Sequence, residues 1–260
     1  MRDLVRHSIA MLRNPRLILL HIVGNAVVLV AASFWLLIPE EHVWQLLGAG
    51  ISSLSIVFVF LWIHSGTLAY AAEPVRENLR TTLTPRIGRL LWLLLGVLVL
   101  FWCMSIVDGW SDSNWQISGY LYSKSPSWLR PTGGDSAWYR PLDYLFSIIY
   151  WYVLPCLFLP AIAAKVAGSG ALRGLGTLCR WQYWLAMAVT TVLGVWVTRL
   201  ILGWTPGHTL GAETVSLGLR LALAYVIATV AWLMTAGLLG YFVGSRNHGA
   251  TAKLVGQAGA

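Results

Sequence analysis

The chain has 260 residues, of which 57% are hydrophobic and only 11% are charged, and its formal net charge is +8. An ordinary soluble domain carries about 25% charged residues, so this composition excludes a chain whose surface faces mainly water. It predicts an all-α fold: a polytopic membrane bundle of about six transmembrane helices, formed by residues 1–260 as a single integral membrane domain. The fifteen tryptophans agree with this prediction, because tryptophan concentrates at membrane–water interfaces.

Six apolar runs follow one another along the chain, and each is long enough to cross a bilayer. A transmembrane helix needs about 20 predominantly apolar residues. The runs cover residues 17–38, 44–71, 90–107, 144–164, 184–203 and 217–244. The first run exceeds the roughly 7–15 apolar residues of a cleavable signal peptide, so we expect it to be a retained span.

Two of the connections between these runs are longer than the others. The first, from Glu73 to Arg89, is predicted to form a short amphipathic helix that Pro85 interrupts. The second, residues 108–143, is predicted to be an outer loop, and it carries seven tryptophan and tyrosine side chains. Because such rings favour head-group depth, we expect this loop to fold back onto the membrane surface.

Basic residues collect on one side of the predicted membrane. Alternate connections (residues 1–16, 73–89, 165–181 and 245–260) hold 13 of the 18 Lys and Arg residues but three of the ten acids. Lysine and arginine mark cytoplasmic segments, so both termini are predicted to be cytoplasmic, in a bacterial cytoplasmic (inner) membrane. The positive charge then needs no nucleic acid as a partner. The expected partners are membrane lipids, membrane proteins or further copies of the chain.

Two histidines are candidates for a cofactor site. His21 lies about one turn into the first span and His64 near the same end of the second, antiparallel span, which predicts similar depth on neighbouring helices. Facing imidazoles can ligate haem iron, here haem b, or another metal. The alternative is a polar pair hydrogen-bonded to the backbone or to Asn25. No further ligand motif accompanies the pair, so the expected cofactor is none, with haem as the open alternative.

Four charged residues near the predicted outer ends form a second candidate site. Arg199 and Arg220 lie one turn inside the fifth and sixth spans, and Glu213 and Asp143 lie close to span ends. Charge inside a membrane is costly and often functional, although long side chains near helix ends also reach the interface. The two interpretations are a site for an anionic ligand or lipid head group, and structural ion pairs.

Proline and glycine mark two further features of the spans. Pro155 and Pro160 lie in the fourth span, where each removes a backbone hydrogen bond and is expected to kink the helix. Kinked spans line binding sites in some transporters, and kinked helices are also common in membrane proteins that have no transport role. Gly237, Gly240 and Gly244 in the sixth span are predicted to form a surface for close helix packing.

The segment LPCLFLPAIAAKVAGSGALRGLGTLCRWQYW, from Leu154 to Trp184, carries the one family resemblance in the chain. A proline-containing span leads into a turn of small residues, an arginine and an aromatic start to the next span. This pattern resembles uncharacterised bacterial multi-pass membrane families, such as the membrane domain attached to some glycerophosphodiester phosphodiesterases. The resemblance covers about 30 residues. It implies a membrane module without the phosphodiesterase chemistry, which belongs to a separate soluble domain.

No catalytic motif for nucleotide binding, serine hydrolysis or zinc proteolysis occurs, and no Asp, Glu or Lys lies at the middle of a span. We therefore expect a protein that is not an enzyme: an accessory or structural subunit that packs against protein or lipid partners. The alternatives are a permease-like module for a small amphipathic molecule and a haem-binding electron carrier.

Overall fold

The computed structural model describes residues 2–39, 41–72, 79, 83–130, 134, 136–205 and 210–258. In this part of the chain every regular element is a helix, and there is no strand. Six helices are long and apolar enough to cross a membrane: Pro15–Trp35, Val43–Ala72, Ile87–Asp112, Ala137–Val166, Trp181–Gly203 and Glu213–Gly244. The predicted all-α, multi-pass membrane fold is confirmed.

The chain divides into two compact units, which we describe separately. The first unit comprises residues 1–94 and 160–260, and the second comprises residues 95–159. The helices of the first unit are α1 (Arg2–Leu12), α2 (Pro15–Trp35), α3 (Val43–Ala72), α9 (Ala171–Leu175), α10 (Trp181–Thr191), η3 (Val192–Val197), α11 (Thr198–Gly203) and α12 (Leu210–Ala258), with parts of α5 (Ile87–Asp112) and α8 (Leu154–Val166).

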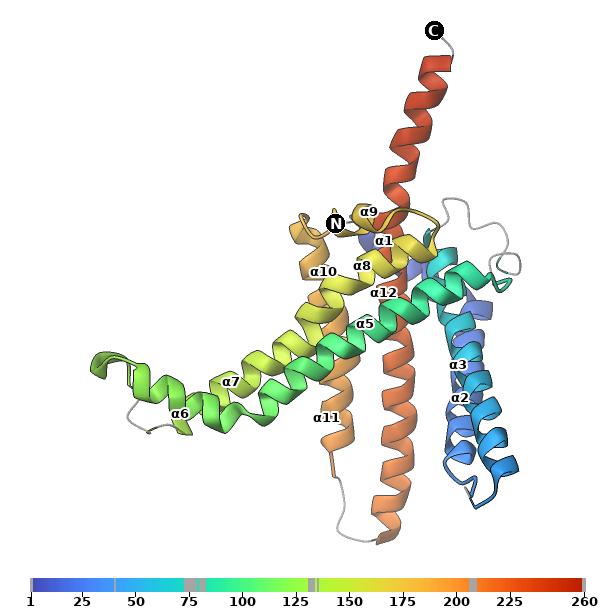
Figure 1. The fold of residues 1–260 in the computed structure, drawn as a ribbon. Helices are drawn as coiled ribbons and strands as arrows, with labels where there is room; N and C mark the ends of the chain where they lie inside the picture. The colour runs from blue at the N-terminus through green and yellow to red at the C-terminus, as the bar shows by residue number, and fades with distance from the viewer. Residues whose placement is uncertain are drawn as a thin grey trace. The chain divides into compact units, whose positions relative to one another are not determined.

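Helix α12 is the centre of the first unit. It contacts α1, α2, α3, α9, α10, η3 and α11, and in Figure 1 it runs between the α2–α3 pair and the α10–α11 segment. In the most apolar part of its membrane span 44% of the residues are buried, against 11% for α2. Helices inside a membrane gain no hydrophobic driving force from water and associate through close packing. Small residues permit this packing, because they let the helix backbones approach each other.

The predicted glycine surface of α12 is the tightest of these contacts. A Cβ added at Gly240 would lie 2.1 Å from the carbonyl oxygen of Ala71, and one at Gly244 would lie 2.8 Å from that of Ala72. One added at Gly237 would lie 2.9 Å from the Cα of Ser8 in α1. These glycines therefore seat α12 against the end of α3 and against α1.

Helix α1 was not anticipated, because its charges place it outside any apolar run. Its buried residues Leu4, Ser8 and Met11 recur at helical spacing and face the rest of the first unit. It ends before Asn14, whose side chain accepts hydrogen bonds from the backbone N–H groups of Arg16 and Leu17 and so caps α2. The basic amino-terminal segment is thus a packed helix followed by a capped transmembrane helix.

The second unit contains helices where a loop was expected. Besides residues 95–112 of α5 and 154–159 of α8, it comprises α6 (Asn114–Lys124), η1 (Ser127–Leu129), α7 (Ser136–Ile148) and η2 (Ile149–Val153). The Nδ2 of Asn114 donates to the carbonyl of Tyr139 at 3.1 Å, and Trp115 lies 6.1 Å from the Tyr139 ring. These contacts pack α6 against α7. The predicted amphipathic helix between Glu73 and Arg89 lies mostly outside the described residues.

The two prolines of the fourth span lie where its backbone is irregular. The π-helical segment η2 ends two residues before Pro155, and Pro160 lies inside α8. Proline has no N–H to complete the turn before it, which explains why a wider turn precedes Pro155. A second π-helical segment, η3, interrupts the fifth span in the same way without a proline.

Candidate functional site

His21 is completely buried, and the groups around it determine which of its nitrogens carries the proton. Its Nε2 is 2.8 Å from the Oγ1 of Thr67, and its Nδ1 is 3.3 Å from the Nδ2 of Asn25. The Thr67 hydroxyl donates its own proton to the carbonyl of Ile63 at 2.8 Å. It is therefore free only to accept, so His21 donates through Nε2 and accepts from the Asn25 amide through Nδ1.

His64 lies next to this network, as its expected depth suggested. The His21 and His64 ring centroids are 5.4 Å apart with an interplanar angle of 64°, an edge-to-face arrangement. The His64 ring also lies 4.2 Å from the ring of Phe60 and 5.0 Å from that of Trp232 on α12. The structure thus brings the two predicted histidines together and adds a third helix to the site.

A tyrosine on α12 links that helix to α2 beside His21. The hydroxyl of Tyr225 lies 3.1 Å from the carbonyl oxygen of His21 and 2.6 Å from that of Ile22, and it donates to this pair of acceptors. Sequence reasoning missed Tyr225 and Trp232, because no pattern in the sixth span indicates which of its faces meets α2. We call the group of His21, Asn25, His64, Thr67, Tyr225 and Trp232 the histidine cluster.

Three buried polar atoms of the histidine cluster have no hydrogen-bond partner among the described residues. They are the Oδ1 of Asn25, the Nε2 of His64 and the Nε1 of Trp232. Leaving such an atom unpaired costs about 1–3 kcal/mol. Because the indole donates and the amide oxygen accepts, the cluster retains capacity for a small polar molecule such as water.

The same geometry bears on the haem alternative. Both ring nitrogens of His21 have hydrogen-bond partners, Thr67 at Nε2 and Asn25 at Nδ1. Whichever nitrogen ligated iron would first have to break its hydrogen bond. Among the described residues no group of three or more His, Cys, Asp or Glu could hold a metal ion. The hydrogen bond between His21 and Asn25 is the one that the polar-pair alternative named, and haem ligation by His21 and His64 stays a prediction.

Removing the hydroxyl of Thr67 should lower the stability of the α2–α3 contact. In Thr67→Val the His21 Nε2–H loses its acceptor inside the membrane, where such hydrogen bonds contribute about 0.6–1.7 kcal/mol. We expect Thr67→Val to lower the free energy of unfolding by about 1 kcal/mol. Thr67→Ser keeps the hydroxyl and should retain most of that stability. Unfolding in mixed detergent measures both variants, and equal stability of the valine and serine variants would contradict the assigned bond.

The second candidate site surrounds Arg220, which is 8% exposed. Its Nε donates to the carbonyl of Ser216 at 3.3 Å. Its Nη1 donates to the carbonyl of Leu202 at 2.9 Å and also to that of Trp204. The last two carbonyls belong to the end of α11 and the residue after it, where helix carbonyls lack internal partners and carry partial negative charge. Arg220 therefore joins α12 to α11 as a cap.

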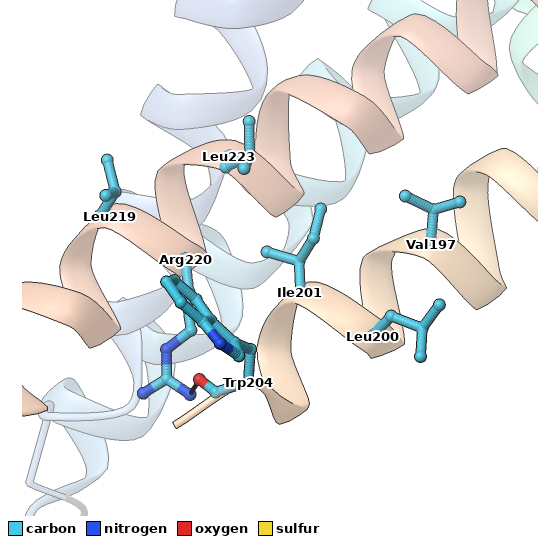
Figure 2. A pocket seen from close by; sticks show the side chains of 7 residues that line it. All are labelled: Val197, Leu200, Ile201, Trp204, Leu219, Arg220 and Leu223. Carbon is cyan, nitrogen blue, oxygen red and sulfur yellow. Dashed lines mark hydrogen bonds between the residues drawn. The ribbon is translucent and has the colours of Figure 1, made fainter. Parts of the chain in front are cut away.

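An apolar pocket of about 320 Å³ adjoins this arginine. Figure 2 shows Arg220 and Trp204 at one end of it, with apolar side chains of α12 and of the η3–α11 segment along its length. These apolar residues are Val197, Leu200, Ile201, Leu219 and Leu223. We call this the Arg220 pocket.

The other members of the predicted charged site lie elsewhere. Glu213 is an exposed residue in the first turn of α12, and Arg199 is exposed on α11 outside the lining of the Arg220 pocket. Asp143 is exposed on α7 and belongs to the second unit. Among the described residues Arg220 bonds to carbonyls and not to either carboxylate. Sequence reasoning expected a carboxylate partner, because backbone acceptors at a helix end leave no residue-specific signal.

No protein-family model, curated protein or solved structure matches this chain.

Proposed function

We propose that this multi-pass membrane protein is a non-enzymatic accessory subunit that packs against protein and lipid partners. The proposal places it in a bacterial cytoplasmic membrane with both termini in the cytoplasm. No catalytic residues are assigned, and no cofactor is required.

An unused small-residue surface on α3 carries the proposal. A Cβ added at Gly50 would meet nothing within 4 Å, in contrast to Gly237 and Gly240 of α12. Ser53, three residues on and on the same face of α3, bonds only to a carbonyl of its own helix, that of Gly50. Interfaces between transmembrane helices are rich in such residues because they let backbones approach. A partner helix can use this surface in the way that α3 uses the glycines of α12.

The positions of helix ends support the proposed orientation. Alternation places the start of α2, the end of α3 and the end of the α12 membrane span at Gly244 on one side of the membrane, and the close approach of Ala71 and Ala72 to Gly240 and Gly244 brings two of these ends together. Arg13 and Arg16 flank the start of α2 on the same side. A basic rim at this face favours the cytoplasm and attracts anionic lipid.

Native mass spectrometry of the protein extracted from its own membrane in mild detergent tests the proposal. We expect an assembly heavier than the 28.7 kDa chain. Gly50→Leu should weaken that assembly by filling the open surface of α3, while Gly109→Leu, at another glycine with open space around it, should not. A chain that remains a monomer carrying only lipid would contradict the protein-partner part of the proposal. A bound haem mass would support the electron-carrier alternative instead.

The permease-like alternative has one observation in its favour. Two spans contain π-helical segments, Ile149–Val153 next to Pro155 and Val192–Val197 next to α11. Such segments are frequent at functional sites, and interrupted helices line the binding sites of transporters. On this alternative a small amphipathic molecule crosses beside the fourth or fifth span. The family resemblance of Leu154 to Trp184 is compatible with either proposal, since it implies only a membrane module.

A further inference from the structure

The guanidinium of Arg220 has donors to spare. An arginine offers five N–H groups. Three of them are directed to the carbonyls of Ser216, Leu202 and Trp204 through Nε and Nη1. The Nη2 group, with two N–H donors, has no acceptor among the residues that the structure describes.

The positive charge of Arg220 is also left without a counter-ion in that part of the chain. Carbonyl oxygens solvate a cation but carry no net charge, and none of the described carboxylates bonds to this side chain. A buried charge without an opposite charge is costly in a membrane, which makes it a strong attractor for an anion. Guanidinium groups suit phosphate in particular, because their planar donors match its oxygens.

The rest of the pocket is apolar and suits a hydrocarbon chain. Apart from Arg220 its lining consists of one tryptophan and five aliphatic side chains. Leu200 is 74% exposed and Leu219 is 65% exposed, so the pocket is open along the surface that the spans present to the bilayer. Trp204 stands beside the guanidinium at the level where tryptophan anchors helices to the interface.

We propose that the Arg220 pocket binds one anionic phospholipid, whose phosphate accepts from the Nη2 of Arg220 and whose acyl chain lies along Ile201, Leu219 and Leu223. An anionic lipid fits better than a zwitterionic one, because the pocket lining contains a cation and no carboxylate to receive an ammonium group. The bound lipid also stabilises the α11–α12 contact, since it neutralises the arginine that caps α11. This inference rests on the lipid-packing part of the proposed function and names the lipid class and its site.

The test measures lipid retention by the purified full-length chain after exchange into phosphatidylglycerol, phosphatidylethanolamine or inorganic phosphate, using native mass spectrometry and the unfolding midpoint. We expect phosphatidylglycerol to be retained with about tenfold higher affinity than phosphatidylethanolamine, as for the gain of one charge pair in a low-dielectric site. Phosphatidylglycerol should raise the unfolding midpoint. Inorganic phosphate should neither remain bound nor raise the unfolding midpoint, because it lacks the acyl chain.

Two variants keep the test decisive if removal of the cap disturbs folding. Arg220→Gln should lose the preference for phosphatidylglycerol, while Leu223→Trp should fill the pocket and reduce retention with the cap intact. Arg199→Gln is the matched control and should behave like the unmodified chain, because Arg199 does not line the pocket. Equal retention of both lipids, or unchanged retention in Leu223→Trp, would overturn the inference, and competition by phosphate alone would reassign the site to a free anion. The same spectra report protein assembly separately from lipid retention. A failure of the lipid-binding inference is therefore distinguishable from a failure of the proposed subunit function.

Discussion

Gly240→Ala should be among the most destabilising single-methyl changes in this protein. The added Cβ would lie 2.1 Å from the carbonyl oxygen of Ala71 and 2.3 Å from its carbon. Carbon–oxygen contacts between packed helices are about 3.3–3.6 Å, so α12 and α3 must separate by about 1 Å. Overpacking against backbone, which cannot rotate away as a side chain can, costs about 1–3 kcal/mol or more.

The damage extends to α1, because the same carbonyl anchors that helix. The Nε2 of His7 lies 3.2 Å from the Ala71 oxygen, so it donates to the oxygen that the new methyl group displaces. The His7 ring also contacts Tyr241 edge-to-face at 5.7 Å, one residue beyond Gly240. We therefore expect a loss of about 3 kcal/mol, at the upper end of the range for overpacking.

Unfolding in mixed detergent measures this loss, with Gly218→Ala as the control on the same helix. A Cβ at Gly218 would meet nothing within 4 Å, so only helix propensity changes there. In a helix interior the helix propensity of alanine is about 1 kcal/mol more favourable than that of glycine. The Gly218→Ala control should therefore be at least as stable as the unmodified chain. A Gly240→Ala variant as stable as the Gly218→Ala variant would contradict the close approach of α12 and α3.

The fold class could be predicted from sequence because lipid imposes a simple rule: each crossing needs an apolar helix of sufficient length. All six spans followed from this rule. Helix α1 did not, because its charged residues interrupt the apolar pattern and it is stabilised by contacts with other helices, mainly α12 and also α2 and α3. The expected loop at residues 108–143 also contains α6 and the start of α7, since their mixed aromatic and polar composition does not distinguish a surface helix from a loop.

The candidate sites were predictable in part for the same reason. Depth along a span can be counted, which placed His21 and His64 at one level. The sequence does not show which face of a span meets which neighbouring helix. Thr67, Tyr225 and Trp232 were therefore missed. Arg220 was identified because a charge in a span is rare. Its partners were not, because they are backbone carbonyls of Leu202 and Trp204 that any sequence would supply.

Gly174→Ala should loosen the turn that links α8 to α10. This turn is closely packed: Gly168 adopts a positive φ of 78°, and Ser169 bonds through both N and Oγ to the carbonyl of Ala164. The Oγ1 of the buried Thr177 donates to the Gly174 carbonyl at 2.8 Å. A Cβ at Gly174 would lie 2.2 Å from the carbonyl oxygen of Pro160. Helix α9 must therefore move away from α8.

The size of the effect depends on how far α9 can shift. It has five residues, and it lies between the capped end of α8 and the start of α10 at Trp181, so it has little chain on either side to absorb a displacement. We expect a loss of about 2 kcal/mol in unfolding free energy, in the middle of the range for overpacking. The local opening should also expose the turn to protease more often.

Limited trypsin digestion separates this local opening from global unfolding. In the Gly174→Ala variant cleavage at Arg173 and Arg180 should be faster than in the unmodified chain, at temperatures where both chains remain folded. Gly170→Ala is the control, since a Cβ there would meet nothing within 4 Å and alanine replaces glycine at this helix start at a cost of only about 1 kcal/mol or less. If Gly174→Ala were digested no faster than Gly170→Ala, the turn would not be held against Pro160. The small residues between Leu154 and Trp184 would then serve mobility of the turn and not its packing, which would favour the permease-like alternative over an accessory subunit.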